Sequence, residues 1–431
     1  MSHHNKTFTT CRLTLLPITL FCLFFAPGIT FFIYSHNSYP QISSLTKISS
    51  SLVSSAHTEK MNSLLKDKVQ GSLVGFYIGD ALAMPIHWYY DLRQLVSDFG
   101  SNGVTKFESP KKQFPGSILN LSNTGGGGRG SDKGDIIGGV IMHGKKQFWM
   151  RGGNYHYHHG MAPGDNTLDA QLTRLLTRTM LEEKSGSPAV VGTLFQQKYI
   201  DFMTHPGNHN DTYANTCHRM FFKNWKDGIP PAQCPDNDGH NVDTIDALMA
   251  VPPVAIAHMH SSPAERAAAI KAAIQSTRRT SEVLSFANIY ADMLLLLLQD
   301  DGVTMQQAAH AAGRQMNLDV AAMVRADGAR RGIGSDPMTA CYISSAFPAL
   351  LHTVYKYGDL SEGGQLPAER ALLASANAGG ENVAKTSLLG ALLGAKYGLA
   401  GLPVHLKEGL LNGKDIRREA EAFAEAFLAR E

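Results

Sequence analysis

Four short segments combine glycine, a carboxylate and small polar residues at the predicted start or end of a helix. They are Gly79-Asp80-Ala81-Leu82, Gly164-Asp165-Asn166-Thr167, Val242-Asp243-Thr244-Ile245-Asp246 and Gly380-Glu381-Asn382-Val383. Hard divalent cations prefer carboxylate, amide and hydroxyl oxygens, and a helix end can supply several of these at once. The same residue types are also the preferred helix caps, so each segment taken alone predicts a cap rather than a metal site.

A histidine-rich stretch precedes the Gly164 segment and is a second candidate for chemistry. It contains His156, His158 and His159, and a further histidine, His87, follows the Gly79 segment. Imidazole nitrogens bind first-row transition metals, so these histidines could replace missing carboxylates and shift a site toward zinc or manganese. Loop histidines more often only form hydrogen bonds or face solvent, and that simpler interpretation is favoured.

The elements that would position these segments are predicted to be α-helices, because apolar residues recur at helical spacing. The predicted helices span residues 66–82, 166–183, 190–203, 244–259, 263–276, 281–298, 304–313, 318–331, 340–357, 367–378, 382–397 and 413–430. Helices joined by short polar loops predict one large all-α domain over residues 61–404. Residues 405–431 are predicted to add an amphipathic helix that packs on this domain.

Residues 101–164 are richer in glycine than the rest of the chain. Residues 125–128 are four consecutive glycines, and residues 136–142 and 147–150 have the pattern of short strands. We predict a small β-hairpin with long loops, inserted between helices. The four glycines lack the Lys-Ser/Thr ending of a phosphate-binding loop, so a flexible loop is the favoured interpretation.

The N-terminus differs in composition from the body of the chain. Residues 13–34 carry no charge, and a stretch of ~20 apolar residues is long enough to cross a bilayer as a helix. Residues 1–35 fit a cleaved signal peptide and an uncleaved signal anchor equally well, and both predict the secretory pathway or a membrane anchor. An organelle-targeting sequence is the third interpretation. Residues 36–60 are rich in Ser, Thr and Lys and are predicted to be a linker.

The composition excludes other classes of function. The formal net charge is +2 and no long basic run occurs, so nucleic-acid binding has no support. The five cysteines include no Cys-x-x-Cys pair, which argues against a cysteine zinc site. The body of the chain has no second apolar span, so contact with a membrane is predicted only through the N-terminal segment, if it is not cleaved.

In their order and spacing, the segments at Gly79, Gly164 and Gly380 resemble the ADP-ribosylglycohydrolase family. The resemblance covers residues 61–403, and a Leu/Gly/Ala-rich helix after the third segment adds to it. It implies an orthogonal all-α fold. It also implies hydrolysis of the bond that links ADP-ribose to a protein side chain or a related acceptor, with two magnesium or manganese ions at the site.

The resemblance implies a set of metal ligands. Asp165 and Glu381 would be the metal carboxylates. Neutral side chains in the same two segments would be further ligands or would orient the others, namely Asn166, Thr167 and Asn382.

The resemblance also implies catalytic residues and the kind of ligand. Asp80 or His87 would act on the attacking water. Independently of the resemblance, we predict that Thr167, His156 and His158 contact the ligand; the resemblance implies that this ligand is an ADP-ribose-like small molecule or an ADP-ribosylated substrate.

The sequence departs from the family's enzyme pattern at three positions. Asn166 and Val383 stand where the enzymes have aspartates, and His87 stands where many members have a glutamate. Because neutral groups replace carboxylates, binding of magnesium, manganese or zinc is predicted to be weakened or lost. These departures resemble the J1-crystallin branch. The alternative to a hydrolase is therefore a catalytically silent binding or structural protein of that branch.

Overall fold

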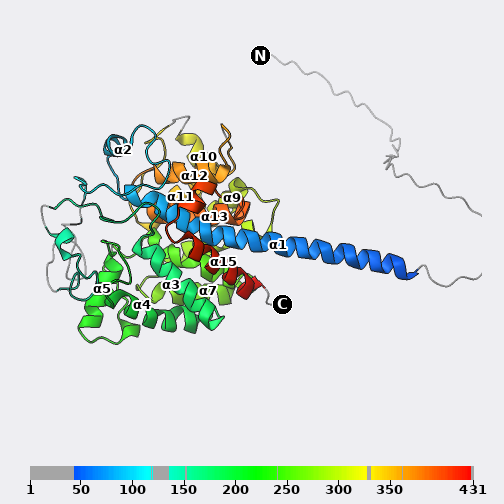
Figure 1. Cartoon of the computed structure of the whole chain (residues 1–431), viewed down its shortest axis with the longest axis horizontal. Coiled ribbons are helices and arrows are strands. Elements are labelled where there is room, and N and C mark those ends of the chain that lie inside the picture. Colours follow the sequence, from blue (N-terminus) through cyan, green and yellow to red (C-terminus); the bar gives the residue numbers. More distant parts are fainter. Residues whose placement is uncertain are drawn as a thin grey trace, which may run out of the picture. The chain divides into compact units, whose positions relative to one another are not determined.

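The computed structural model describes residues 43–117, 119, 135–150, 153–239, 241–327, 332–361 and 363–428, with the backbone alone for residues 43–59 (Figure 1). The predicted targeting segment and the four glycines at 125–128 lie outside the described residues. The described residues from 56 onward form one compact unit. Part of the predicted linker is helical, because the first helix begins at Ser43.

The described part of the chain is all-α, as predicted. Its α-helices are α1 (Ser43–Ala83), α2 (Leu92–Phe99), α3 (Leu168–Glu183), α4 (Phe195–Thr204), α5 (Thr216–Lys226), α6 (Val251–Ala257), α7 (Pro263–Gln275), α8 (Glu282–Gln299), α9 (Met305–Gln315), α10 (Val320–Ala326), α11 (Ile343–Tyr357), α12 (Pro367–Ala376), α13 (Val383–Tyr397), α14 (Val404–Gly409) and α15 (Gly413–Leu428). Shorter helical turns are η1 (Met84–Ile86), η3 (Lys146–Trp149), η4 (Ala189–Leu194), η5 (Pro231–Gln233) and η6 (Ile245–Ala250).

The prediction of a β-hairpin is wrong for the described residues. Residues 136–142 form a tight turn in which Gly138 N donates to Ile141 O at 2.7 Å, and the second predicted strand is the helical turn η3. Ile136, Ile141 and Trp149 are buried. Their apolar pattern therefore reflects side chains that anchor a loop in the core, and not strands of a sheet.

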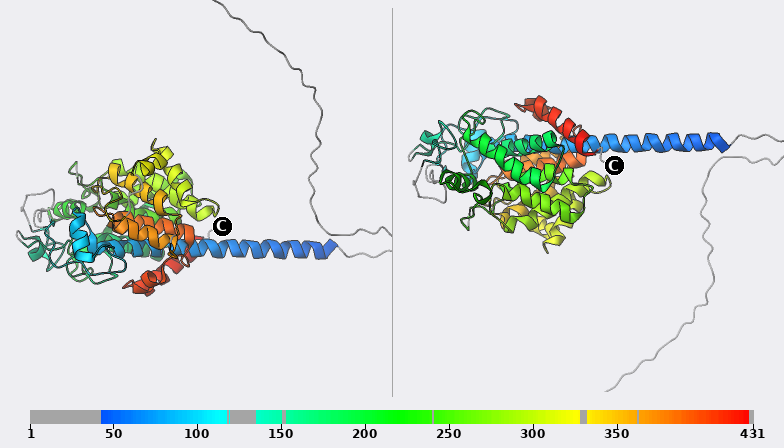
Figure 2. Two further views of the ribbon diagram at one scale, coloured as in Figure 1. Left: turned by 90° about the horizontal axis from the view of Figure 1, so that it is seen from above. Right: turned by 90° about the horizontal axis from the view of Figure 1, so that it is seen from below.

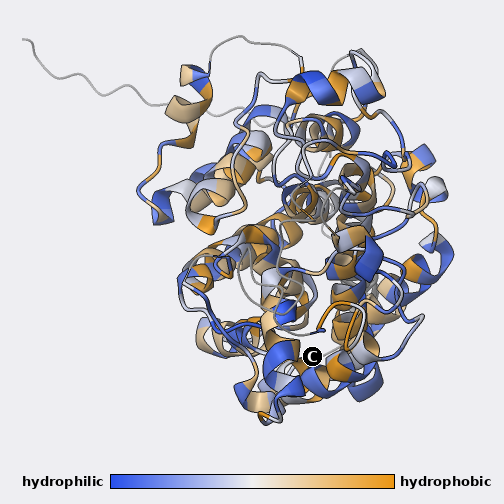
Figure 3. Ribbon diagram, turned by 90° about the vertical axis from the view of Figure 1, so that its left-hand side faces the viewer, coloured by the Kyte–Doolittle hydropathy of each residue, from blue (hydrophilic) through white to orange (hydrophobic). Residues whose placement is uncertain are grey.

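The core is formed by helices that are buried on almost every side. The first 13 residues of α13, Val383–Ala395, are all buried, and α13 contacts α8, α11 and α12. Helix α8 is long and apolar enough to cross a membrane by length and composition, but 56% of it is buried inside the fold. Figure 3 shows hydrophobic residues along many helices and hydrophilic residues in many of the loops that join them.

Helices α1 and α13 pack backbone against backbone through a seam of glycines, which we call the glycine seam. A Cβ atom on Gly75 would lie 2.2 Å from Gly390 O, and one on Gly79 would lie 2.1 Å from Thr386 O. Gly71 and Gly394 continue the seam. The register is antiparallel, and α1 and α13 lie side by side in Figures 1 and 2. The seam therefore holds the C-terminal end of α1 beside the first turns of α13.

Candidate functional site

The first predicted metal segment is the N-terminus of α3, and Asp80 of α1 closes it. Asp80 Oδ1 accepts from Thr167 N and from Asn166 Nδ2, both at 2.8 Å, and Asp80 Oδ2 accepts from Thr167 Oγ1 at 2.6 Å. All three residues are buried. Burial raises the pKa of Asp80 to about 7, although the bonds from Thr167 and Asn166 oppose the shift. This carboxyl group acts as a buried helix cap, and it lines neither of the two cavities described below, in which a substrate could meet an attacking water.

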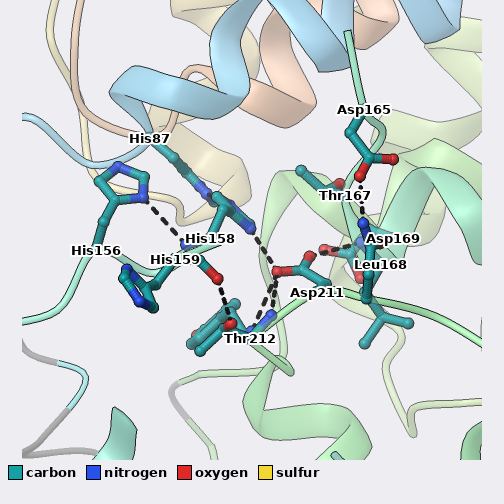
Figure 4. Close-up of polar contacts among 12 residues, drawn as sticks. His87, His156, His158, His159, Asp165, Thr167, Leu168, Asp169, Asp211 and Thr212 are labelled. Carbon is teal, nitrogen blue, oxygen red and sulfur yellow. Dashed lines mark hydrogen bonds and ion pairs between the residues drawn. The ribbon is translucent and has the colours of Figure 1, made fainter. Parts of the chain in front are cut away.

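A residue that the sequence analysis missed, Asp211, completes the start of α3. Its Oδ2 accepts from Leu168 N at 2.7 Å, and its Oδ1 accepts from Thr212 N at 2.7 Å and from His158 Nδ1 at 2.8 Å (Figure 4). Burial pushes the pKa of Asp211 upward, but His158 and the backbone donors outweigh burial and lower the pKa below its ordinary value. The only signal in the sequence is that Asp211 lies in a polar Asn-Asp-Thr run.

His158 and His87 connect Asp211 to the second predicted metal segment. His158 Nε2 lies 2.7 Å from His87 Nδ1, and the two rings are stacked with 6° between their planes. His87 Nε2 lies 2.9 Å from Glu381 Oε2. All four residues are buried. Together Asp211, His158, His87 and Glu381 form a continuous hydrogen-bonded series, which we call the buried network.

Glu381 ends the buried network at the N-terminus of α13. Its Oε2 accepts from Trp88 Nε1 at 2.7 Å as well as from His87, and its Oε1 accepts from Ala384 N at 3.1 Å. Burial pushes the pKa of Glu381 upward, but the His87 ring and the Ala384 N–H outweigh it and lower the pKa. Glu381 is therefore an ionised carboxylate held at a helix N-terminus, where negative charge is favoured.

Two other predicted site residues lie apart from the buried network. His156 accepts from His158 N at 3.1 Å and packs against the rings of Tyr89 and Phe114, and burial lowers its pKa well below the ordinary value. The side chain of Asn382 donates to backbone oxygens, and its Oδ1 is buried without a partner. Neither side chain lines either of the two cavities described next.

Two separate cavities reach the two predicted metal segments, one each. The first, which we call the cleft, has a volume of 240 Å³ and is lined by Arg219, Asp246, Glu381 and aromatic residues, namely Trp88, Tyr90, Tyr157, Tyr213 and Tyr342. The second, which we call the groove, has a volume of 350 Å³ and is lined by Asp165, Asn166 and neighbouring polar residues. Glu381 thus faces the cleft, whereas the acid that was predicted as its metal partner faces the groove.

The described residues do not assemble the oxygen-rich cluster that a dication needs. Among them, no group of three or more His, Cys, Asp or Glu side chains is placed to hold a metal. Asp165 accepts from Asn166 N and from Asn210 Nδ2, and Asn166 turns its amide nitrogen toward Asp80. Thr167 donates its hydroxyl to the same carboxylate. The Asp165 carboxylate is therefore engaged by N–H donors of the protein itself, whereas the predicted ligand oxygen Asn382 Oδ1 is buried without a partner.

Chemically, the cleft offers two carboxylates, of which Asp246 is paired with Arg278, and one buried cation, Arg219, between aromatic walls. Glu381 accepts three hydrogen bonds of the roughly four that a carboxylate can accept, so one position remains for a water or a hydroxyl group. The rings of Trp88 and Tyr213 meet edge to face at 4.9 Å, and the ring of Tyr157 meets Trp88 at 4.5 Å. Such walls suit a sugar ring or a base.

Both a family model and solved structures match this chain. The family model described as ADP-ribosylglycohydrolase matches residues 61–431, a range that includes α14 and α15. A solved structure described as an "ADP-ribosylglycohydrolase-related protein complex" aligns with a TM-score of 0.51 and 16% identity, over 84% of this chain and 98% of that chain. At this identity the structural match supports the fold alone. No curated protein matched the sequence.

Proposed function

Because this chain belongs to the ADP-ribosylglycohydrolase family, we propose that it hydrolyses the glycosidic bond of an ADP-ribosyl group or a related phosphorylated glycoside in the cleft. The family acts on ADP-ribosylated substrates and generally depends on a divalent metal. The observation that carries the proposal is the cleft itself, in which the Glu381 carboxylate and the buried Arg219 cation share one cavity. The predicted metal ligands do not fit a two-ion centre, so no step of the proposed reaction uses a metal ion.

Arg219 supports a substrate that carries a negative charge. The residue is only 3% exposed, and its guanidinium donates to two neutral oxygens, Ala214 O at 2.6 Å and Thr216 Oγ1 at 3.0 Å. Its Nε has no hydrogen-bond partner, and among the described residues no carboxylate pairs with it. A buried charge is costly unless it is paired, and a phosphate group is a strong partner for a guanidinium. A phosphate of the substrate would supply the missing anion.

The cleft would bind the glycosyl end of such a substrate. Ligand pockets commonly have volumes of ~300–1,000 Å³, and this cleft is somewhat smaller at 240 Å³. It therefore fits one sugar ring with its neighbouring groups better than a whole dinucleotide. The sugar would lie against Trp88 and Tyr157, with its charged end toward Arg219.

Glu381 would then activate the attacking water. A water in the free acceptor position gives a proton to Glu381 while its oxygen forms a bond to the anomeric carbon. The bond from that carbon to the leaving nitrogen or oxygen breaks, the electron pair goes to the leaving atom, and that atom takes the proton from Glu381. His87 acts as a positioning residue, because its Nε2 bonds to the carboxylate while its Nδ1 is held by His158, and it does not line the cleft.

The alternative is a catalytically silent protein of the J1-crystallin kind. Hydrogen bonds within the protein favour this alternative. The Asp80 carboxylate accepts from both the N–H and the hydroxyl of Thr167, so neither residue is left to act on a metal or a substrate. On this alternative the cleft binds a ligand, or nothing, and converts no substrate.

The test is a hydrolysis assay with the full chain. ADP-ribosylated arginine, ADP-ribosylated serine and O-acetyl-ADP-ribose are each offered with magnesium, manganese, zinc or chelator. We expect turnover of at least one substrate, a loss of about 100-fold or more in kcat for Glu381→Gln, and a rise in KM of about 10-fold for Arg219→Gln. Arg93→Gln, at an exposed arginine outside the cleft, is the control. Absence of turnover under every condition would favour the silent alternative.

A further inference from the structure

We infer that Asp246 and Asn215 form a hydroxyl-binding pair on the wall of the cleft, and that this pair selects a ribosyl ring with a free hydroxyl group on carbon 2. Both residues line the cleft. Asp246 ends the segment at residues 242–246, for which the proposed reaction has no role. The inference deepens the proposed function, on which it rests for the kind of ring that enters the cleft.

Asp246 is an ionised carboxylate that can accept one more hydrogen bond. Its Oδ2 accepts from Arg278 Nη2 at 2.7 Å and from Asn215 Nδ2 at 2.8 Å. Burial pushes the pKa of Asp246 upward, but Arg278 and the Thr244 hydroxyl outweigh burial and lower the pKa. These donors use three of the roughly four positions at which a carboxylate accepts. The side chain is 10% exposed, so the remaining position is available to a ligand in the cleft that Asp246 lines.

Asn215 adds a second acceptor, whose orientation is fixed. The residue stands at the N-cap of α5, where an asparagine oxygen ordinarily accepts from the first turn, yet its side chain makes no cap hydrogen bond. Its Nδ2 instead donates to Asp169 Oδ2 and to Asp246 Oδ2, both at 2.8 Å. Because Asp246 is paired with Arg278 and only accepts, the amide nitrogen has to face it. Among the described residues no donor reaches Asn215 Oδ1, which is left for a ligand.

The chemistry of the hydroxyl-binding pair fits the hydroxyl groups of a sugar. The pair offers acceptors and no spare donor, and Arg278 balances the charge of Asp246, so a neutral donor suits it better than a cation. Asp246 and Glu381 line the same cleft. A ring with its anomeric carbon at the water on Glu381 can therefore present the hydroxyl of the adjacent carbon to Asp246. Hydrogen bonds to this hydroxyl strengthen as a glycosidic bond breaks.

The first experiment compares two ligands that differ by one hydroxyl group. Ribose 5-phosphate and 2-deoxyribose 5-phosphate are each titrated into the full chain, and binding is measured by isothermal titration calorimetry. Both ligands carry the phosphate proposed for Arg219, so the comparison isolates the hydroxyl. We expect ribose 5-phosphate to bind at least about 10-fold more tightly. Equal affinities, or no binding of either sugar at about 10 mM, would overturn the inference.

The second experiment assigns the preference to the pair. Asn215→Ala removes the amide acceptor and Asp246→Asn removes the charged one, and we expect the ratio of the two affinities to fall to about 2-fold or less in each. Asp292→Asn, which breaks an exposed ion pair with Arg266 outside the cleft, should keep the wild-type ratio. If the loss of the partner of Arg278 prevents Asp246→Asn from folding, Asn215→Ala decides. An unchanged ratio in that variant would contradict the inference.

Binding and turnover can fail separately. A preference for ribose 5-phosphate in a chain that hydrolyses nothing would support the hydroxyl-binding pair and count against the proposed activity. Hydrolysis of ribosyl and 2-deoxyribosyl substrates with equal kcat/KM would support the activity and overturn the role of the pair.

Discussion

The starts of α3 and α13 are built from the same residue types, yet only one of them opens onto the cleft. Each has a glycine, an acid and an asparagine before its first turn: Gly164-Asp165-Asn166 and Gly380-Glu381-Asn382. At α3, Asp80 and Asp211 arrive from other parts of the chain and take up the N–H donors. At α13, Glu381 caps the helix itself and still lines the cleft. The motif therefore specifies a helix start, and access to the cleft decides whether its carboxylate can do chemistry.

The contact that holds α1 against the start of α13 should give the largest effect when it is broken. In Gly79→Ala the new methyl group would lie 2.1 Å from Thr386 O, and no side-chain rotation can relieve a clash with backbone. We expect the free energy of unfolding to fall by about 4 kcal/mol or more, or soluble protein to be lost. Urea unfolding followed by circular dichroism measures it.

A matched control is Gly192→Ala in η4, where the nearest atom would be the Ala272 side chain at 3.3 Å. We expect this variant to be close to wild type. If Gly79→Ala were also as stable as the wild type, the glycine seam would not be what fixes the distance between α1 and α13.

The two ends of the buried network should respond differently to loss of charge. Asp211→Asn removes the partner of His158 and weakens the cap of α3, and we expect it to lower the free energy of unfolding by about 3 kcal/mol. Glu381→Gln should cost less stability, because two of its three donors can still be accepted by the amide oxygen, and should abolish turnover. Parallel urea unfolding and hydrolysis assays separate the two effects. Equal losses of stability would show that the α13 start is as structural as the α3 start.

The free energy of unfolding should decrease as the pH rises, because the pKa of Asp80 is raised in the folded protein. Its pKa is raised to about 7 in the folded protein, whereas the unfolded chain binds this proton only below about pH 4. The folded state therefore holds the extra proton between these values, and the stability that this contributes is lost as the pH rises through about 7. The expected loss between pH 6 and pH 8 is about 1.4 kcal/mol, measured by urea unfolding at each pH.

Asp80→Asn tests the assignment of this pH dependence. Asparagine mimics the protonated acid, since its oxygen can accept from Thr167 N and its amide can donate to Thr167 Oγ1. We expect a smaller change of stability over the same pH range. If the slope persisted unchanged in this variant, another group would be responsible for it.

The smallest effect is expected for Asp165→Asn. Asp165 faces the groove and accepts from Asn166 N and Asn210 Nδ2, so the substitution should cost about 1 kcal/mol or less and leave turnover unchanged. A large loss of turnover would return Asp165 to the metal role that the family resemblance implies. The same assays as for Glu381→Gln apply.

Most helices could be predicted from the sequence because their apolar residues repeat at helical spacing. The segment 244–259 divides into η6 and α6, and two prolines, Pro252 and Pro253, lie at the start of α6. Helices α2, α5 and α14 were missed. Helices α2 and α14 are short, and α5 buries His218 and Arg219 among its apolar residues, which hides the usual periodicity.

The candidate site was predictable only where its residues are neighbours in the sequence. Thr167 and Asn382 precede their helices as the capping residues indicated. The contact between His87 and His158 joins positions that are 71 residues apart. That Arg219 Nε is buried without a hydrogen-bond partner depends on how the whole chain folds around it. Helical periodicity contains no information on such contacts, which is why Asp211 was missed.

The glycine seam also has a consequence for biosynthesis. Gly75 emerges from the ribosome about 300 residues before its partner Gly390, and no side chain on either glycine can form a substitute contact in the meantime. Closing so long a loop is entropically costly and slow. The small-residue face of α1 therefore stays uncovered until nearly all of the polypeptide has been translated. A nascent chain that stops before α13 has the first helix of the domain but not the surface against which that helix folds.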